Sequence, residues 1–141
     1  MRIPTHLQHE PVIGVSFYSK LDGKYKTNTP PSDAKALSIG KAQYDKDEFS
    51  AKVFRHNDNS NRWSPQSEEL PFHRVLDLAI LLVSTIAKGK DESYKSDTLE
   101  EEVLRKSELV NLIDYLNTEK NELRPRLIEL GKHIDIVLKN Y

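Results

Sequence analysis

Leucine, isoleucine and valine are concentrated in the second half of the chain. Residues 1–69 contain nine of them, whereas residues 70–141 contain 25. Six of the seven prolines lie at or before position 71. Proline opposes helix interiors, whereas dense leucine at helical spacing favours helices. The pattern therefore predicts a strand-and-loop half, residues 1–66, followed by a helical half, residues 67–141.

Three segments of the first half have the composition of strands. Residues 12–17 are rich in β-branched and aromatic side chains. Residues 37–44 and 48–55 flank a polar stretch, residues 45–47, which is typical of a hairpin. Residues 21–33 and 57–61 are expected to be loops, because both are polar and the longer one contains Asp-Gly and Pro-Pro pairs.

The second half is expected to form three helices. The first begins near Pro71, ends before Gly89 and is apolar on most of its circumference, which is typical of a helix at the centre of a core. The second begins at Thr98, where Thr98 and Glu101 match a capping box, and runs to about residue 117. In the third, Pro125 either occupies the first turn or kinks a longer helix. The apolar stripe of this third helix consists of Leu123, Leu127, Leu130, Ile134, Val137 and Tyr141.

Together these elements predict a single α+β domain that spans residues 1–141. The length suits one domain. Strands that are followed by helices, without alternation, favour α+β over a doubly wound sheet. We therefore expect a small antiparallel sheet from the first half, packed against about three helices from the second.

The composition excludes several classes of protein. The absence of cysteine excludes disulfide scaffolds, cysteine zinc sites and thiol nucleophiles, and a net charge of −1 does not favour nucleic acid as a partner. Because no signal peptide or membrane-spanning stretch is visible, we expect a cytoplasmic protein without a membrane partner. Phosphate-loop, dinucleotide, zincin and hydrolase motifs are missing. The sequence identifies no cofactor and no metal site, and His6 and His9 are expected to be solvated near the terminus.

One set of side chains would allow catalysis. Glu69, His73 and Asp77 are spaced four residues apart, so on a continuous helix they would share one face. Two carboxylates and an imidazole can ligate a divalent metal or form an acid/base pair. However, Pro71 places Glu69 before the regular helix, and acids are expected at a helix N-terminus in any case because they complement its dipole. An ordinary helix surface is therefore the favoured interpretation.

The hairpin offers a candidate anion site. If Tyr44 faces Phe49 across the turn, Lys41 lies directly opposite Lys52, which is destabilising unless an anion lies between them. A shift of the register by one residue would remove this pair. We expect the ligand surface where the end of the hairpin, the loop around residue 63 and the start of the first long helix meet. The predicted ligand-binding residues are Lys52, Arg55, His56, Trp63 and Arg74, with His73 beside them.

Two further features bear on partners. Trp63, the only tryptophan, either contacts a ligand or, as we favour, folds back as a lid on the core. The second predicted helix has more apolar surface than one intramolecular neighbour needs, which favours a homodimer. The alternative is that one stripe packs on the sheet and the other on neighbouring helices. The side chains that would form the dimer contact are Leu104, Leu109, Leu112 and Leu116.

Several short segments resemble a small family of uncharacterised bacterial proteins, a domain of unknown function. The segments are Ile3-Pro4-Thr5-His6-Leu7, Ser50-Ala51-Lys52-Val53, Trp63-Ser64, Ser67-Glu68-Glu69-Leu70-Pro71 and His73-Arg74-Val75-Leu76-Asp77. The resemblance covers about the first 90 residues. It implies a bacterial, intracellular setting and supplies no activity.

We therefore expect a non-enzymatic binding or protein-interaction domain with an anion-binding surface, which takes a small anionic ligand and forms a homodimer. One alternative is a metal-dependent or acid/base enzyme that uses Glu69, or its neighbour Glu68, with His73 and Asp77. Another is a structural subunit of a larger assembly.

Overall fold

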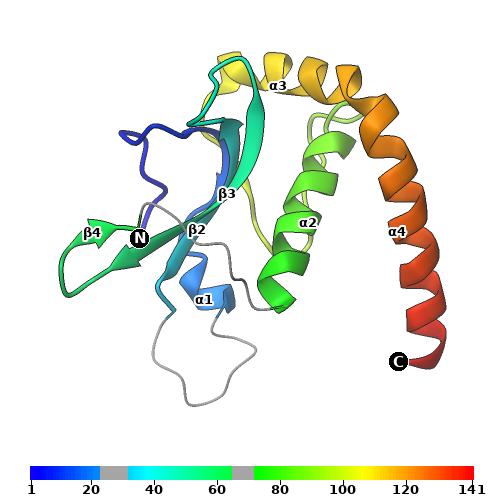
Figure 1. Ribbon diagram of the computed structural model, residues 1–141, viewed down its shortest axis with the longest axis horizontal. Helices are drawn as coiled ribbons and strands as arrows, with labels where there is room; N and C mark the ends of the chain where they lie inside the picture. The colour runs from blue at the N-terminus through cyan, green and yellow to red at the C-terminus, as the bar shows by residue number, and fades with distance from the viewer. Residues whose placement is uncertain (23–31, 65–71) are drawn as a thin grey trace.

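A computed structural model of the chain describes residues 1–22, 32–64 and 72–141. Within these ranges the chain forms a five-stranded sheet in the order β4-β3-β2-β1-β5, in which all neighbours are antiparallel. The first half supplies β1 to β4, and the short edge strand β5 comes from the second half. Three long helices follow in the second half (Figure 1). The α+β prediction is therefore confirmed. The strands are β1 (Glu10–Val15), β2 (Ala34–Lys41), β3 (Phe49–Asn57), β4 (Arg62–Trp63) and β5 (Glu102–Val103), and the helices are α1 (Ser19–Asp22), α2 (Phe72–Ala87), α3 (Lys106–Thr118) and α4 (Lys120–Asn140).

The predicted hairpin is present as β2 and β3, but its predicted register is wrong. Lys41 lies opposite Phe49, and Lys52 lies opposite Ser38. The strands separate earlier than a tight turn would require, because residues 42–48 form a longer connection. This connection is closed by a hydrogen bond from Ala42 N to Glu48 O of 2.9 Å. The two lysines are therefore not paired, and the argument for an anion between them no longer holds.

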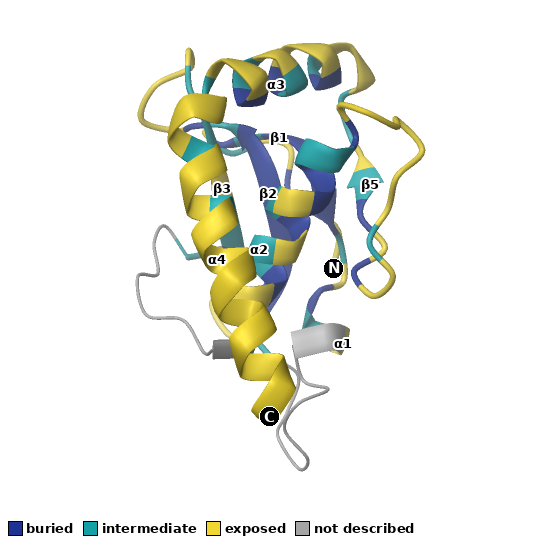
Figure 2. Cartoon of the chain, turned by 90° about the vertical axis from the view of Figure 1, so that its right-hand side faces the viewer, coloured by how far each residue is buried: buried dark blue, intermediate teal, exposed yellow. Residues whose placement is uncertain are grey.

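The two faces of the sheet are covered differently. The helical side carries the main core, which brings Leu37 of β2 together with Leu81 of α2 and with Leu109 and Leu112 of α3. Figure 2 shows this buried interior between the sheet and the helices. The opposite face carries a smaller cluster of Ile3, Ala36 and Phe54, with Leu7, Trp63 and Leu104 packed against it.

Helix α2 begins and ends close to where the sequence predicts, but it is not buried all round. Leu81 is fully buried toward the sheet, whereas Val75, Leu76, Ile80 and Val83 are exposed. The exposed residues lie on the opposite side of the helix, because positions three and four apart share a face. The expectation of a helix buried on most of its circumference is therefore wrong.

The second predicted helix begins later than expected. Residues 98–105 are not helical, and β5 within them pairs with β1 at the edge of the sheet, with Val103 opposite Ile13. Leu104 N also donates to Val12 O at 2.8 Å. The helix α3 therefore begins at Lys106, and the capping-box interpretation of Thr98 is wrong because pairing with β1 holds this segment extended.

The last two helices are separate, with α3 ending at Thr118 and α4 beginning at Lys120. Pro125 lies inside α4, beyond its first turn. The leucines predicted to form a dimer contact are used within the chain itself: Leu109, Leu112 and Leu116 belong to the main core, and Leu104 packs on the smaller cluster. The homodimer stays a prediction. In the described part of the chain, no helix is long and apolar enough to cross a membrane.

Candidate functional site

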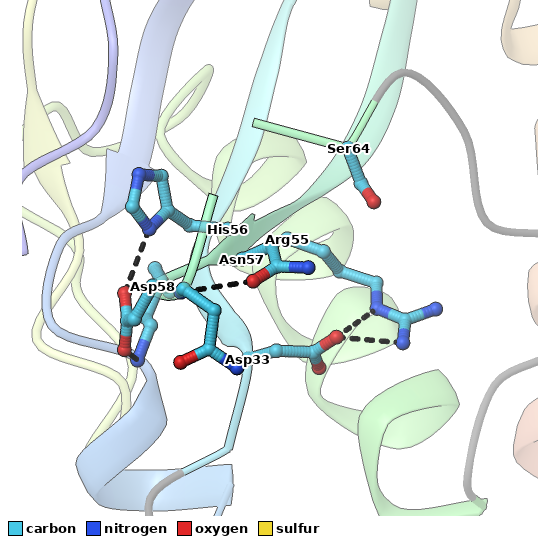
Figure 3. Close-up of a pocket in the computed structure, with 8 residues that line it drawn as sticks. Asp33, Arg55, His56, Asn57, Asp58 and Ser64 are labelled. Carbon is cyan, nitrogen blue, oxygen red and sulfur yellow. Dashed lines mark hydrogen bonds and ion pairs between the residues drawn. The ribbon is translucent and has the colours of Figure 1, made fainter. Parts of the chain in front are cut away.

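A polar pocket of about 560 Å³ lies where β2 begins and β3 ends (Figure 3). Every described side chain that lines it is polar or charged, which distinguishes it from the two apolar clusters of the sheet. The lining residues are Asp33, Lys35, Arg55, His56, Asn57, Asp58, Asn59 and Ser64.

The hairpin itself brings these residues together. Antiparallel pairing places Ala34, at the start of β2, opposite Arg55, near the end of β3. The register then shifts between Ala34 and Ala36, so that Lys35 has no partner of its own on β3. Such a bulge changes the direction in which a side chain points. Here it leaves Lys35 among the lining residues of the pocket.

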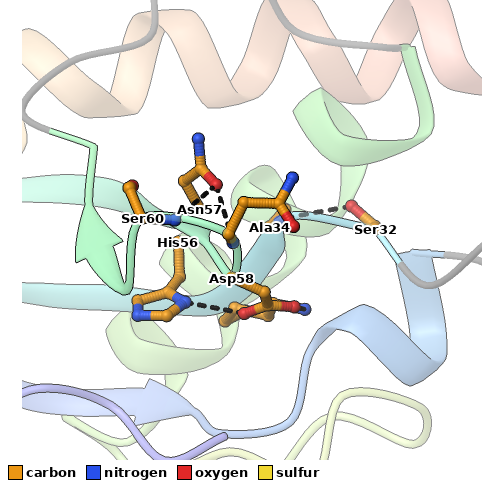
Figure 4. Close-up of polar contacts among 8 residues, drawn as sticks. Ser32, Ala34, His56, Asn57, Asp58 and Ser60 are labelled. Atoms are coloured by element: carbon orange, nitrogen blue, oxygen red, sulfur yellow. Dashed lines mark hydrogen bonds and ion pairs between the residues drawn. The ribbon is translucent and has the colours of Figure 1, made fainter.

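The turn after β3 completes the wall of the pocket. Asn57 Oδ1 accepts hydrogen bonds from the backbone N of Asn59 at 2.9 Å and of Ser60 at 3.3 Å (Figure 4). Asn61 has a φ of 51°, a left-handed conformation that asparagine tolerates better than most residues. The run of asparagines in this segment is therefore explained by a turn that leads directly into β4.

Two buried groups converge on one exposed carboxylate in the pocket. His56 Nδ1 lies 2.7 Å from Asp58 Oδ1, and Lys35 Nζ lies 3.3 Å from Asp58 Oδ2 (Figures 3 and 4). The side chains of Lys35 and His56 are only 8% and 5% exposed, whereas that of Asp58 is 66% exposed. Hydrogen bonds from His56 and then from Lys35 lower the pKa of Asp58. The carboxylate is therefore ionised at neutral pH and accepts a hydrogen from Nδ1 of the imidazole.

A second ion pair forms the other side of the pocket. Arg55 Nε and Nη2 donate to Asp33 Oδ2 at 2.9 and 2.7 Å. This hydrogen bonding raises the pKa of Arg55. The backbone N of His56 also donates to Asp33 O at 2.8 Å, which ties the start of β2 to the end of β3. The described lining of the pocket therefore includes one lysine, one arginine and two carboxyl groups.

Trp63 packs beside the pocket without lining it. Its ring centroid lies 4.9 Å from that of His56 and 5.8 Å from that of Phe54, both in edge-on arrangements. It covers the smaller apolar cluster, so the prediction that Trp63 is a lid is confirmed. By packing on His56 it also restricts the orientation of the imidazole.

The other predicted ligand residues lie elsewhere. Lys52 donates to Gln43 Oε1 at 2.6 Å and lies over the Phe54 ring, toward the opposite end of the hairpin, and burial lowers its pKa. Arg74 is buried on α2, with Nη2 3.4 Å from Ser32 Oγ, next in sequence to the pocket residue Asp33. Of the five predicted ligand residues, Arg55 and His56 line the pocket.

The candidate catalytic residues are only partly described. Glu68 and Glu69 lie outside the described residues. His73 is half-buried on α2. Asp77 is buried and accepts a hydrogen bond from the hydroxyl of Tyr18 at 2.5 Å, which connects α2 to the segment after β1. Among the residues that the structure describes, no group of three or more carboxylates and imidazoles is placed to hold a metal ion.

Sequence reasoning missed the residues that come from the start of β2 and from the turn. Asp33, Lys35 and Asp58 were not singled out, although they supply most of the charge in the pocket. A signal was present: the first residues of one hairpin strand must lie beside the last residues of the other. The charged positions 33 and 35 would then be expected next to positions 55–58.

Comparison with protein families matches residues 1–113 to a family of unknown function, DUF6530. The matched region contains the whole sheet, all the pocket residues, α2 and the first part of α3, whereas α4 lies beyond it. No curated protein and no solved structure matches the chain. The chain therefore belongs to the family of unknown function DUF6530.

Proposed function

We propose that this protein is a binding module that takes up a small organic anion, a carboxylate or a phosphate ester, in the pocket between β2 and β3. The observation that carries the proposal is the arrangement of Lys35, His56 and Asp58. The basic groups are buried in the wall of the pocket, whereas the acid that neutralises them is exposed.

Burial of a lysine is costly unless its charge is compensated, and lysine is rarely found fully buried for that reason. Within the described residues, the charge of Lys35 is compensated by the carboxylate of Asp58 at 3.3 Å, which is largely in solvent. Because the exposed carboxylate can rotate away more easily than the buried groups, Asp58 occupies the position that the anionic group of a ligand would take. In the second ion pair Asp33 is also more exposed than its partner Arg55, with side chains that are 46% and 33% exposed, although Arg55 is not buried.

The rest of the wall indicates what the remainder of the ligand is like. Asn57, Asn59 and Ser64 offer amide and hydroxyl groups, which can both donate and accept hydrogen bonds. A cavity of about 560 Å³ falls within the usual size range of small-molecule sites. We therefore propose an anion that also carries hydroxyl groups, such as a hydroxy acid or a sugar phosphate.

The test is a titration of the purified protein with inorganic phosphate, citrate and a hexose phosphate, followed by calorimetry and by thermal unfolding. Ligand in hundredfold excess over Kd stabilises the native state by about 2.7 kcal/mol, a shift of several degrees. Lys35→Met and Arg55→Ala should weaken binding at least tenfold. Asp58→Ala should strengthen it severalfold, because it removes the competing carboxylate.

Lys52→Ala is the matched control, since it removes a lysine from β3 at a position outside the pocket. It should leave binding unchanged. The proposal is wrong if none of the three anions binds at millimolar concentration. It is also wrong if Lys35→Met binds as well as the wild type, or if Asp58→Ala weakens binding as much as Lys35→Met does.

The two alternatives from the sequence rank below this proposal. An enzyme built on Glu69, His73 and Asp77 would need Asp77 for chemistry, and that carboxylate is buried and engaged by Tyr18. A structural subunit would need a surface for its partner, and the pocket between β2 and β3 is not such a surface because it is small and polar. Neither alternative accounts for the buried basic groups of the pocket.

A further inference from the structure

The C-terminal helix α4 exposes its apolar side chains along its length. None of its 21 residues is buried. Leu123 packs against the main core, and from Ile128 onward every large apolar residue of α4 is between 43% and 68% exposed. An amphipathic helix gains most of its stability from burial of its apolar face. This face therefore requires a partner.

Six apolar residues between positions 123 and 141 follow the spacing of a coiled coil, whereas Ile128, Ile136 and Leu138 lie outside this series. The intervals between successive members of the series are four, three, four, three and four residues, which is a heptad pattern over almost three heptads. A seam of this kind is typical of helices that pair along their length. The members are Leu123, Leu127, Leu130, Ile134, Val137 and Tyr141.

The neighbouring helix enlarges this surface. Figures 1 and 2 show α4 running along the side of α2 that faces away from the sheet. On α2, Val75, Leu76, Ile80 and Val83 are 40% to 60% exposed. Together with α4 they form one exposed apolar surface on this side of the molecule. Contiguous exposed apolar surfaces mark sites of interaction with other chains.

We infer that this surface is covered by a second copy of the chain, with the two α4 helices paired antiparallel. In one register the seam is complementary to itself: Leu123 meets Tyr141 of the second copy, Leu127 meets Val137, and Leu130 meets Ile134. All six seam residues are then paired by the two-fold symmetry that isologous dimers have. The exposed residues of α2 flank the paired helices.

The residues beside the seam are compatible with this register. Arg124 lies opposite Leu138 of the second copy, so no like charges face each other there. Gly131 lies opposite its own copy at the centre, and a Cβ added to it would meet nothing within 4 Å in the single chain, so this position is open to a close approach. Lys120 occupies the same heptad position as Leu127 and Ile134. A parallel pair of α4 helices would therefore place Lys120 against Lys120 of the second copy.

The first test is sedimentation of the full-length protein at micromolar concentration. The wild type should be a dimer. Leu130→Lys and Ile134→Lys each place a charge in the seam and should give a monomer with an unchanged circular dichroism spectrum of the sheet. Asp135→Lys, which adds a lysine on the same helix outside the seam, is the matched control and should remain a dimer.

The second test determines the orientation by disulfide formation, for which the lack of native cysteine is an advantage. Gly131→Cys should cross-link to itself, and Arg124→Cys should cross-link to Leu138→Cys. Lys132→Cys, on the outer side of the helix, should not react. A parallel pair would give neither of the expected products.

Three outcomes overturn the inference. A monomeric wild type shows that α4 has no second copy as its partner. A dimer that survives both lysine variants shows that the contact lies elsewhere. Failure of both cross-links in a dimer excludes the antiparallel register. None of these outcomes bears on the pocket, because no residue of α4 lines it.

Discussion

His9 lies under the smaller apolar cluster, on the face of the sheet away from the helices. Its Nε2 is 3.0 Å from Ser38 Oγ, and its ring meets the ring of Phe54 at 5.6 Å. Burial lowers its pKa to about 4, with smaller contributions from the positive charges of Lys52, Lys46 and Arg105. The expectation that this histidine is solvated is therefore wrong, because the N-terminal segment folds over the sheet.

The depressed pKa of His9 makes stability depend on pH. The unfolded chain binds a proton near pH 6.5, and the folded chain binds it only near pH 4. The stabilisation that the neutral His9 ring gives the folded state is therefore fully present above about pH 6.5, and it is lost as the pH falls toward 4. Lowering the pH from 7 to 5 should therefore reduce the free energy of unfolding by roughly 2 kcal/mol through His9 alone.

The measurement is urea unfolding at both pH values. His9→Gln keeps a polar group for Ser38 but cannot be protonated in this range. Its loss of stability between pH 7 and pH 5 should therefore be smaller than that of the wild type by roughly 2 kcal/mol. His6→Gln, at an exposed position, is the control and should behave as the wild type. An equal loss in wild type and His9→Gln would contradict the assignment.

At the scale of elements, residues 96–105 show how a local signal can be overruled. Thr98 and Glu101 have the spacing of a capping box, yet Glu101 is buried and accepts hydrogen bonds from the backbone N and the Oγ of Ser96 at 2.8 and 2.6 Å. Burial raises the pKa of this carboxyl. Hydrogen bonds with Ser96 and Ser84 together lower the pKa by more than burial raises it, so that the pKa lies below its usual value. The buried carboxylate fastens this connecting segment to the helical layer.

We expect Glu101→Gln to destabilise the protein by about 1–3 kcal/mol. The neutral amide weakens the charge-assisted hydrogen bonds, and its NH₂ group replaces the oxygen that accepts from the Ser96 hydroxyl. Glu100→Gln, at the exposed neighbouring position, should change the unfolding free energy by less than about 0.5 kcal/mol. Urea unfolding of the two variants at neutral pH makes the comparison. Equal stability of the two would show that the carboxylate of Glu101 is not a structural contact.

The parts of the fold that could be predicted are those determined by local pattern. The periodicity around Leu81 identifies α2, and the polar stretch at Asp45 identifies the hairpin. The register of that hairpin depends on hydrogen bonds within residues 42–48, which no period of the sequence reports. The same limit applies to the site: Arg55 and His56 were identified on one strand, but Lys35 and Asp58 join them through a bulge and a turn.

At the scale of the whole molecule, α4 is an addition to the sheet and the first three helices. Apart from Leu123, its side chains do not join the core of the described residues. A chain that ends at Arg126 should therefore keep its fold. In dilute solution its unfolding free energy should lie within about 1 kcal/mol of that of the full-length chain.

Chemical unfolding at low protein concentration tests this. Anion titration gives a second readout, because no residue of α4 lines the pocket. A truncated chain that is unfolded, or that loses several kcal/mol, would show that α4 packs on the body of the molecule. Binding of the same anions with the same affinity is expected in both chains.

The pairing of β1 with β5 also has a consequence for the order in which the chain folds. The hairpin of β2 and β3 joins neighbouring strands and closes a short loop, whereas the pairing of Val103 with Ile13 closes a long stretch of chain that includes α2. Contacts between distant residues form late, because a long loop must first be closed. The hairpin is therefore the natural nucleus, and a nascent chain would complete its sheet only after residue 103 has been synthesised.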